Sequence, residues 1–356
     1  MLYRILVINP KYEKTKIAVY ENEQEIFLKT IYHSSDDLIP YKKVCDQMEF
    51  RKRLITTELM NNELMMDFNA IVGVGGLVKP IRSGTYEVSE RLKEDLRKGQ
   101  QGEAACNLGG LIAAEIASSI PGARAFISNP AVVDEMDEIA KITGLPEIPR
   151  RSKFHALNQK MAGRKFAKEH NSHYEDLNLI IAHLGRGISV AAHRKGRVVD
   201  VNNAIEGSGP FSSERVGTLP AGDLITLCFS GKYTEEELNY KIRHESGLYA
   251  HLGTNDANTA ERLASDGDKH ASLILKAMSY NIAKEIAAVS IALEGVIDGI
   301  ILTGAIAYNQ LITEQIFNYV RHISPVTIYP GENEMLALAE NALEILKGEY
   351  ACLTYQ

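Results

Sequence analysis

The feature that most restricts the fold of this chain is a pattern of three consecutive apolar strands that occurs twice. Each copy runs strand, short turn, strand, short turn and strand. Turns this short join neighbouring antiparallel strands, so each copy predicts a three-stranded meander. The predicted strands are residues 3–9, 16–20 and 24–33 in the first copy, and 177–183, 188–193 and 197–202 in the second.

Stretches with a helical pattern lie between and after the meanders. They are residues 89–97, 154–169, 234–243 and 270–293. A meander followed by strand–helix alternation, used twice, predicts a duplicated α/β fold of two domains with a cleft between them. A chain of 356 residues is long enough for two such domains.

The domain boundary is expected near residues 146–151 (PEIPRR), where two prolines interrupt the pattern. We therefore assign residues 1–150 to the first domain and residues 151–332 to the second. A last helix is predicted at 334–347, after a Pro-Gly turn. In a duplicated fold, the segment 333–356 is expected to cross back to the first domain.

Composition and charge argue against several classes of function. The net charge of −7 is spread along the chain, and no Lys/Arg cluster marks a nucleic-acid-binding surface. The most apolar region, 286–307, is interrupted by Glu294 and Asp298 and suits a buried helix and strand better than a membrane span. The first residues show no signal-peptide pattern, and the four cysteines have no CxxC spacing. We expect a cytoplasmic protein with reduced cysteines.

Three turns that follow strands are candidates for phosphate binding, since backbone N–H groups at such turns bind anions. They are residues 9–16 (NPKYEKTK), 185–189 (GRGIS) and 303–305 (TGA). A glycine after a strand is more often an ordinary turn residue. The placement of these turns at equivalent points of the two repeats favours a nucleotide site instead.

Four ionisable residues stand out, each with an alternative reading. Arg215 lies in the segment 207–220, rich in Gly, Ser and Pro, and is either an anion clamp or a surface arginine. His155 is either a site residue or a capping or core histidine of the helix 154–169. His183 ends a strand and faces either the cleft or the core. Asp200 either holds a metal or forms a turn.

A series of short segments, in constant order along the chain, carries a resemblance to a known family. They are ILVINP (5–10), NLGGLIA (107–113), VVDEM (132–136), FHALNQK (154–160), DLNLIIAHLG (176–185), AAHRKGRVVDVNNA (191–204), GPFSSERVGTLPAGDL (209–224), LCFSGKYTEEEL (227–238), AHLGTND (250–256), IILTGAIAY (300–308) and YPGENEMLALAENALEIL (329–346). The sequence thereby resembles the butyrate kinase family of the acetate kinase superfamily. The resemblance implies a duplicated actin-like ATPase fold and ATP-dependent phosphorylation of a short-chain carboxylate, with Mg²⁺.

The resemblance also assigns roles to individual positions of this chain. A carboxylate such as butyrate would lie near Arg215 and the first domain, and ATP would lie mainly on the second. No general base is needed, because a carboxylate is already ionised at neutral pH. The implied catalytic residues are Asn9, Lys16, His155 and Arg215, and the implied nucleotide-binding residues are His183, Gly185, Arg186, Gly187, Gly304, Ala305, Gly331 and Glu332. It names no metal ligand.

Several positions depart from the family pattern as the resemblance gives it. The first phosphate turn reads NPKYEKTK where the family has NPGSTSTK, so residues 11–14 are bulky or charged. Val74 stands at an arginine, Ala104 at a histidine and Asn129 at an aspartate. Arg186 and Ala305 each stand at a glycine. If the family's roles carry over, Val74, Ala104, Asn129 and Arg215 line one cleft between the halves.

Two functions from different classes follow from this pattern. The first is an active carboxylate kinase. The second is a catalytically impaired paralogue that binds nucleotide, a metabolite or a partner subunit. An arginine at the transferring phosphoryl group is worth about 10³–10⁵ in rate, so its loss leaves at best ~0.1 s⁻¹. Lys11, Lys14 or Arg186 would have to supply the missing charge. A sugar kinase of the superfamily is disfavoured, because the matching segments belong to the carboxylate branch.

The resemblance further implies self-association through the second domain. The predicted helix 270–293 is long enough to pack against a partner, so we expect at least a dimer with isologous symmetry.

Overall fold

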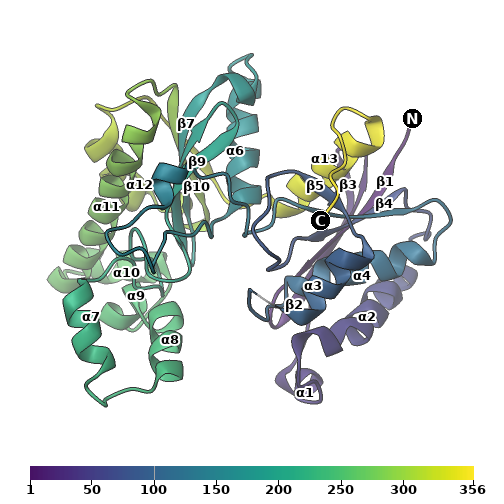
Figure 1. Cartoon of the computed structure of the whole chain (residues 1–356), viewed down its shortest axis with the longest axis horizontal. Coiled ribbons are helices and arrows are strands. Elements are labelled where there is room, and N and C mark those ends of the chain that lie inside the picture. Colours follow the sequence, from purple (N-terminus) through teal and green to yellow (C-terminus); the bar gives the residue numbers. More distant parts are fainter. Residues whose placement is uncertain (100) are drawn as a thin grey trace. The chain divides into compact units, whose positions relative to one another are not determined.

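The computed structural model of the chain describes residues 1–99 and 101–356. It divides into two compact units. The first contains Met1–Val133 together with Asn333–Gln356, and the second contains Asp134–Glu332 (Figure 1). The second unit thus begins ahead of the division at residues 150 and 151 expected from the sequence.

The first unit is built on a mixed sheet of six strands within the described residues, in the order β3-β2-β1-β4-β6-β5. Strands β1, β2 and β3 form the antiparallel meander, while β1, β4 and β6 are parallel to one another. Short β5 closes the edge antiparallel to β6. Their bounds are β1 Arg4–Pro10, β2 Lys14–Glu21, β3 Gln24–Tyr32, β4 Ala70–Val74, β5 Thr85–Glu87 and β6 Arg124–Ser128.

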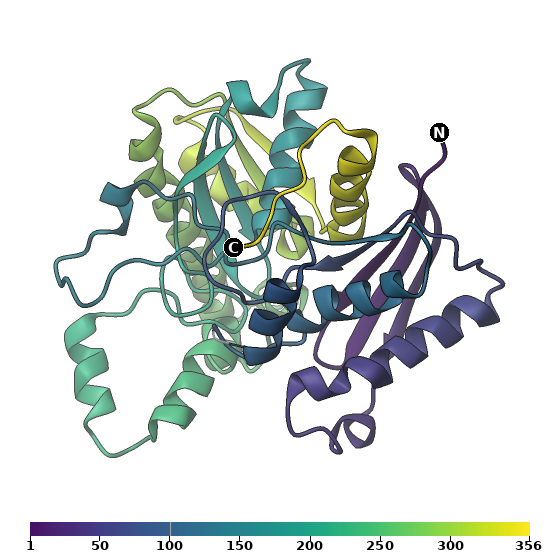
Figure 2. The ribbon, with the colours of Figure 1, turned by 45° about the vertical axis from the view of Figure 1, so that its right-hand side comes forward.

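Helices cover both faces of this sheet. Leu6 and Ile8 of β1 join a buried cluster with Ile55 of α2 (Met48–Asn61) and Ile112 of α4 (Asn107–Ser118). Side chains of a strand alternate between faces, so Ile5 and Val7, also fully buried, point the other way. Helix α13 (Glu334–Lys347) packs on β1 and β4, and Figure 2 shows this last helix, in yellow, beside the sheet. The other helical elements of the unit are α1 Ser35–Leu38, η1 Val44–Gln47 and α3 Glu90–Lys98.

The second unit repeats this plan. Within the described residues its sheet has five strands in the order β11-β10-β7-β8-β9, which matches β6-β4-β1-β2-β3 position for position. Strands β7, β8 and β9 are the antiparallel meander, and β10 and β11 continue it in parallel with β7. The bounds are β7 Asn178–Leu184, β8 Ile188–Arg194, β9 Arg197–Val201, β10 Gly299–Gly304 and β11 Val326–Pro330. The predicted duplicated α/β fold is confirmed.

Two long helices cover one face of the second sheet and one helix covers the other. Helices α11 (Lys269–Ser290) and α12 (Gln310–Val320) pack on Ile180 and Ile300, whereas α6 (Ala156–Glu169) packs on Ile181 (Figure 1). The remaining helical elements are α5 Glu138–Lys141, η2 Tyr174–Asp176, α7 Ala221–Cys228, α8 Glu235–His244, α9 Gly247–Leu252, α10 Ala257–Ser265, η3 Ile291–Leu293 and η4 Ala305–Tyr308.

Both predicted meanders and all the predicted helices are present, with ends displaced by a few residues. Ser89 and Thr234 are N-caps, each accepting a backbone N–H with its hydroxyl, so α3 and α8 start one residue later than expected. Among the described residues, no helix is long and apolar enough to cross a membrane.

Candidate functional site

Three parallel strands of the second unit end side by side and bring predicted residues together. Thr303 of β10 pairs with His183 of β7, and Gly304 exchanges backbone hydrogen bonds of 3.1 and 3.0 Å with Gly331. Gly304 has φ +94°, and a Cβ there would lie 2.4 Å from the carbonyl oxygen of Leu184. Only glycine fits this position. Ligands of α/β sheets bind at such carboxyl ends of strands.

A stacked pair of histidines lies at these strand ends. The rings of His155 and His183 are 4.0 Å apart and nearly parallel. His183 Nε2 is 3.1 Å from Oε1 of Glu332, which lies two residues after the end of β11. Gly185 belongs to the same group, because a Cβ there would lie 3.2 Å from His183 Nε2 and 3.5 Å from Glu332 Oε1. His183 is fully buried, and that it faces a cleft stays a prediction.

His155 lies immediately before α6, not within it. Its Nδ1 is 2.8 Å from the hydroxyl of Ser189. It makes no side-chain hydrogen bond that caps the helix. The ring of His155 stacks on His183, and that His155 is a site residue stays a prediction.

The turn between β7 and β8 carries an ion pair that the sequence did not predict. Arg186 donates from Nε to Glu214 Oε1 at 2.9 Å and from its terminal nitrogen to Oε2 at 3.0 Å. Glu214 is only 3% exposed, whereas the Arg186 side chain is 75% exposed. Asn255 adds a hydrogen bond to Glu214 at 3.3 Å. The Arg186 guanidinium is thus bound to a carboxylate of its own unit.

Arg215 lies against the same turn. Its terminal nitrogen donates to the carbonyl oxygen of Ala204 at 2.6 Å. A Cβ on Gly187 would lie 2.0 Å from that nitrogen, so a side chain there would displace the guanidinium. Burial lowers the pKa of Arg215, and its Nε has no hydrogen-bond partner among the described residues. Arg215 is therefore a half-buried cation with unused donor capacity.

Ala305 is exposed at the start of η4. Among the described residues, no group of three or more His, Cys, Asp or Glu side chains is arranged to hold a metal. Asp200 forms an ion pair with Arg150, with 2.8 Å between the terminal nitrogen of Arg150 and Oδ1 of Asp200. Mg²⁺ that arrives with a nucleotide needs only one or two protein carboxylates, and Glu332 at the strand ends fits that need.

In the first unit, the predicted residues Asn9 and Lys16 face each other across the β1–β2 pair. Asn9 Nδ2 donates to Glu334 Oε2 at 2.6 Å, and Lys11 Nζ lies 3.0 Å from the same oxygen. Asn9 Oδ1 is buried without a partner in the described part of the chain. Lys11, one of the residues considered for charge compensation, is paired with an acid.

Arg51 of α2, which sequence reasoning missed, holds the turn between β1 and β2. It is 1% exposed and donates to the carbonyl oxygens of Lys11 and Tyr12, both at 2.8 Å, and to Thr15 Oγ1 at 3.0 Å. Gln47 accepts two further bonds from it. Burial lowers the pKa of Arg51 to about 10. In this turn, carbonyl oxygens face a cation of the protein, an arrangement opposite to an anion cradle of N–H groups.

The same Thr15 hydroxyl is 2.8 Å from Nε2 of buried His33. Burial, assisted by the nearby Arg51 charge, lowers the pKa of His33 to about 4. The folded state thus keeps His33 neutral, while the unfolded chain protonates it near pH 6.5. Stability from this group is complete above pH 6.5 and is lost as the pH falls towards 4.

We expect His33→Gln to reduce the acid-induced loss of stability between pH 6.5 and 4 by roughly 2–3 kcal/mol, the part of the linkage free energy that titrates in this window. Urea unfolding at several pH values measures this. The matched control is His322→Gln, at an exposed histidine, which should leave the pH dependence unchanged. An identical pH dependence in both variants would contradict the role of His33.

The three substituted positions of the first unit all lie in this unit's sheet region or beside it. Val74 is the last residue of β4 and pairs with Ser128, the last residue of β6. Asn129 follows Ser128 directly in the chain. Asn129 has φ +42° and accepts from the backbone N–H of Gly84 at 2.8 Å. Ala104 lies in the turn before α4. That these three share a cleft with Arg215 stays a prediction.

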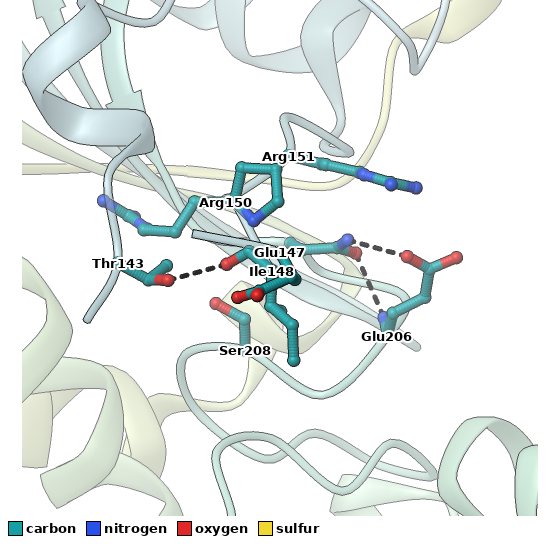
Figure 3. Close-up of a pocket in the computed structure, with 9 residues that line it drawn as sticks. Thr143, Glu147, Ile148, Arg150, Arg151, Glu206 and Ser208 are labelled. Carbon is teal, nitrogen blue, oxygen red and sulfur yellow. Dashed lines mark hydrogen bonds between the residues drawn. The ribbon is translucent and has the colours of Figure 1, made fainter. Parts of the chain in front are cut away.

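A pocket of about 450 Å³ opens in the second unit between segments 143–151 and 203–208. Figure 3 shows Arg150 and Arg151 at its rim, pointing in opposite directions. One wall is fixed by Thr143, which donates to the carbonyl oxygen of Ile148 at 2.7 Å. None of the predicted site residues is among the described residues that line it.

Comparisons with known proteins show which family the chain belongs to. Residues 146–339 match the model of the acetokinase family. The chain is 50% identical to butyrate kinase 2 of Clostridium acetobutylicum, covering 100% of both chains. It is 49% identical to a probable butyrate kinase of Bacteroides thetaiotaomicron, covering 99% of this chain and 100% of that one.

Solved structures show the fold. An acetate kinase of Porphyromonas gingivalis superposes with a TM-score of 0.78 at 18% identity, covering 97% of this chain and 100% of that one. A propionate kinase of Francisella tularensis gives 0.77 at 17% identity, covering 95% and 98%.

Proposed function

Because the chain belongs to the acetokinase family and matches butyrate kinases along its whole length, we propose that it transfers the γ-phosphoryl group of ATP to a short-chain carboxylate such as butyrate. The products are an acyl phosphate and ADP. The observation that carries the proposal is the gathering of His183, Gly185, Gly304 and Glu332 at adjacent strand ends, with Arg215 against the neighbouring turn. A cytoplasmic location, where ATP is available, is part of the proposal.

The proposed chemistry needs positioning and charge more than proton transfer. A carboxylate oxygen attacks the γ-phosphorus, a new P–O bond forms, and the bond from phosphorus to the β–γ bridging oxygen breaks. Arg215 donates hydrogen bonds to the transferring group from donors that its Ala204 contact leaves unused. Glu332 would hold the Mg²⁺, which would supply positive charge to offset that of the nucleotide phosphates. Glycines 185, 187 and 304 let the backbone approach the nucleotide.

Contacts within the first unit support the proposal that the enzyme is slow. Arg51 orients carbonyl oxygens of the turn after β1, and Lys11 is paired with Glu334. Asn129 binds the backbone of Gly84. These contacts favour a second candidate function, a paralogue that binds nucleotide without useful turnover. Our proposal is turnover at or below ~0.1 s⁻¹, the rate that remains without the arginine that the resemblance implies at position 74.

A hydroxamate-trapping assay with ATP, Mg²⁺ and butyrate tests this, run beside an ordinary butyrate kinase. Acyl phosphate formed slowly, and only with both substrates, is the expected result. Turnover of ~1 s⁻¹ or more, the ordinary kinase range, would refute the impairment. No product from any short-chain carboxylate, together with nucleotide binding, would establish the second candidate.

The ion pair at the β7–β8 turn makes a prediction about nucleotide binding. Without Arg186, the buried Glu214 carboxylate keeps the hydrogen bond from Asn255 but loses the guanidinium that compensates its charge beside the proposed phosphate site. Arg186→Gly should therefore weaken ADP binding about tenfold, or 1.4 kcal/mol, even though glycine is the family's residue there. Glu214→Gln added to Arg186→Gly removes the unpaired charge and should restore affinity.

Thermal-shift titration with ADP measures the effect, since a hundredfold excess over Kd stabilises the native state by about 2.7 kcal/mol. Arg262→Ala, at an exposed arginine of α10, is the control and should bind as the parent does. Tighter ADP binding by Arg186→Gly would show instead that Arg186 obstructs the site.

Self-association is the last part of the proposal. None of the residues of α7 is buried, and two large apolar side chains lie open there. Ile225 is 59% exposed, and Phe229, just after the helix, is 88% exposed. On α11, Leu273 is 62% exposed. Such apolar surface suits an interface between copies of the chain. We expect light scattering at micromolar concentration to give at least twice the 39.4 kDa of one chain. Phe229→Glu and Leu273→Glu show which helix is responsible, and a monomeric parent would contradict the prediction.

A further inference from the structure

A chain of buried hydrogen bonds runs from Tyr174 to His155 through the second unit. The Tyr174 hydroxyl is 2.5 Å from Nδ1 of His193, whose Nε2 is 2.9 Å from Oε1 of Gln159. The Nε2 of Gln159 is 2.9 Å from Ser189 Oγ, which is 2.8 Å from Nδ1 of His155. The three residues in the middle of this chain, His193, Gln159 and Ser189, are 0% exposed.

The orientation of the Gln159 amide fixes the direction of every hydrogen bond in this series. Gln159 Nε2 also lies 3.0 Å from the backbone carbonyl oxygen of Ser189. A carbonyl oxygen only accepts, so the atom facing it must be the amide nitrogen of Gln159 and not its oxygen. The amide orientation is therefore determined by backbone, independently of any histidine.

The Gln159 orientation sets the proton on His193. Because Gln159 Oε1 can only accept, the Nε2 of His193 must carry the proton. His193 Nδ1 then has a lone pair, and the Tyr174 hydroxyl donates to it. This is the only arrangement that satisfies all three groups of a neutral His193.

The same orientation sets the proton on His155. Ser189 Oγ accepts from Gln159 Nε2 and, at 3.5 Å, from the backbone N–H of His155, which together occupy both of its lone pairs, so its own hydroxyl proton is donated to Nδ1 of His155. A neutral His155 that accepts at Nδ1 carries its proton on Nε2.

We propose that Gln159, acting through Ser189, is a positioning residue that holds His155 as the Nε2–H tautomer, so that His155 offers a hydrogen-bond donor to an anionic oxygen of the substrates. The identity of that anion rests on the proposed function. A donor at Nε2 attracts a phosphoryl or carboxylate oxygen, whereas a lone pair there would repel it. The stacked His183 ring keeps the His155 ring plane in place.

The test uses the full chain labelled with ¹⁵N-histidine and read by long-range ¹H–¹⁵N spectra without substrates, at a pH well above the ordinary histidine pKa of about 6.5. His155→Gln assigns the His155 signals. The expected result is a protonated Nε2 and an unprotonated Nδ1 for both His155 and His193. A proton on Nδ1 of His155 overturns the proposal.

Variants then test the cause. Gln159→Leu frees the acceptor site of Ser189, so the fraction of His155 protonated at Nδ1 should rise, and kcat/KM should fall by roughly 10–100-fold, as when second-shell partners of ligand-binding histidines are removed. Tyr174→Phe is the matched control. It alters the same buried network, but the Ser189 carbonyl still orients Gln159, so the His155 tautomer should not change.

If Gln159→Leu fails to fold, Ser189→Ala and Ser189→Thr replace it. The alanine variant loses the hydroxyl and should show mixed His155 tautomers, and the threonine variant should restore the Nε2–H form. An unchanged His155 spectrum in Gln159→Leu or Ser189→Ala overturns the proposal. If the tautomers are as expected but the protein has no kinase turnover, only the proposed function is refuted. If the protein turns over but His155 is protonated at Nδ1, only this inference is refuted.

Discussion

Arg215→Lys should lower kcat about 10³-fold or more while leaving the fold intact. An arginine aimed at a transferring phosphoryl group contributes about 10³–10⁵ in rate. Lysine keeps the charge but loses the planar fork, so it cannot bind the Ala204 carbonyl and the phosphoryl group at once.

Steady-state kinetics of acyl phosphate formation measure this, with circular dichroism as a check on folding. Arg243→Lys is the matched control, since Arg243 lies on α8 and pairs with Glu206 at 3.5 Å. Its kcat should stay within a factor of two or so of the parent, as expected for a surface pair worth about 0–1 kcal/mol. A kcat for Arg215→Lys within tenfold of the parent would remove Arg215 from the mechanism.

Arg51→Met should destabilise the protein by about 3–5 kcal/mol, the largest stability effect that we predict. The substitution leaves the carbonyl oxygens of Lys11 and Tyr12 and the amide of Gln47 without their donor. Each buried group left unsatisfied costs about 1–3 kcal/mol. Methionine fills much of the arginine's volume, so loss of hydrogen bonds, and not a cavity, dominates.

Urea unfolding followed by circular dichroism gives the difference in free energy. Lys52→Met changes the next residue of the same helix, whose ammonium pairs with Glu49 and Glu115 near the surface, and should cost at most about 1 kcal/mol. Equal midpoints for the two variants would show that Arg51 does not hold the turn.

The sheet and its duplication could be predicted because they depend on the pattern of apolar residues and turns within short stretches of the sequence. Apolar runs such as 177–183 with short turns specify a meander within a few residues, and the capping hydroxyls of Ser89 and Thr234 lie next to the helices they begin. Glycines at strand ends could also be predicted from the sequence, since Gly304 needs a positive φ that other residues rarely adopt.

The missed residues act over long separations in the sequence. Arg51 reaches a turn about forty residues earlier, Glu214 binds an arginine 28 residues before it, and Gln159 bonds to a serine 30 residues on. Nothing in the neighbourhood of these side chains signals their partners. Asn129 likewise read as a lost aspartate, because its bond to Gly84 depends on a backbone conformation visible only in the fold.

The order in which the elements follow one another has a consequence for synthesis of the protein. The helix that covers Ile5 and Val7 is α13, and the acid that binds Asn9 is Glu334. The first sheet therefore emerges from the ribosome with one apolar face bare, and it stays so until the whole of Asp134–Glu332 has been made. The second unit, contiguous in the chain, has its complete core while the first still waits for its last helix. The first unit can therefore be completed only after the second has been synthesised.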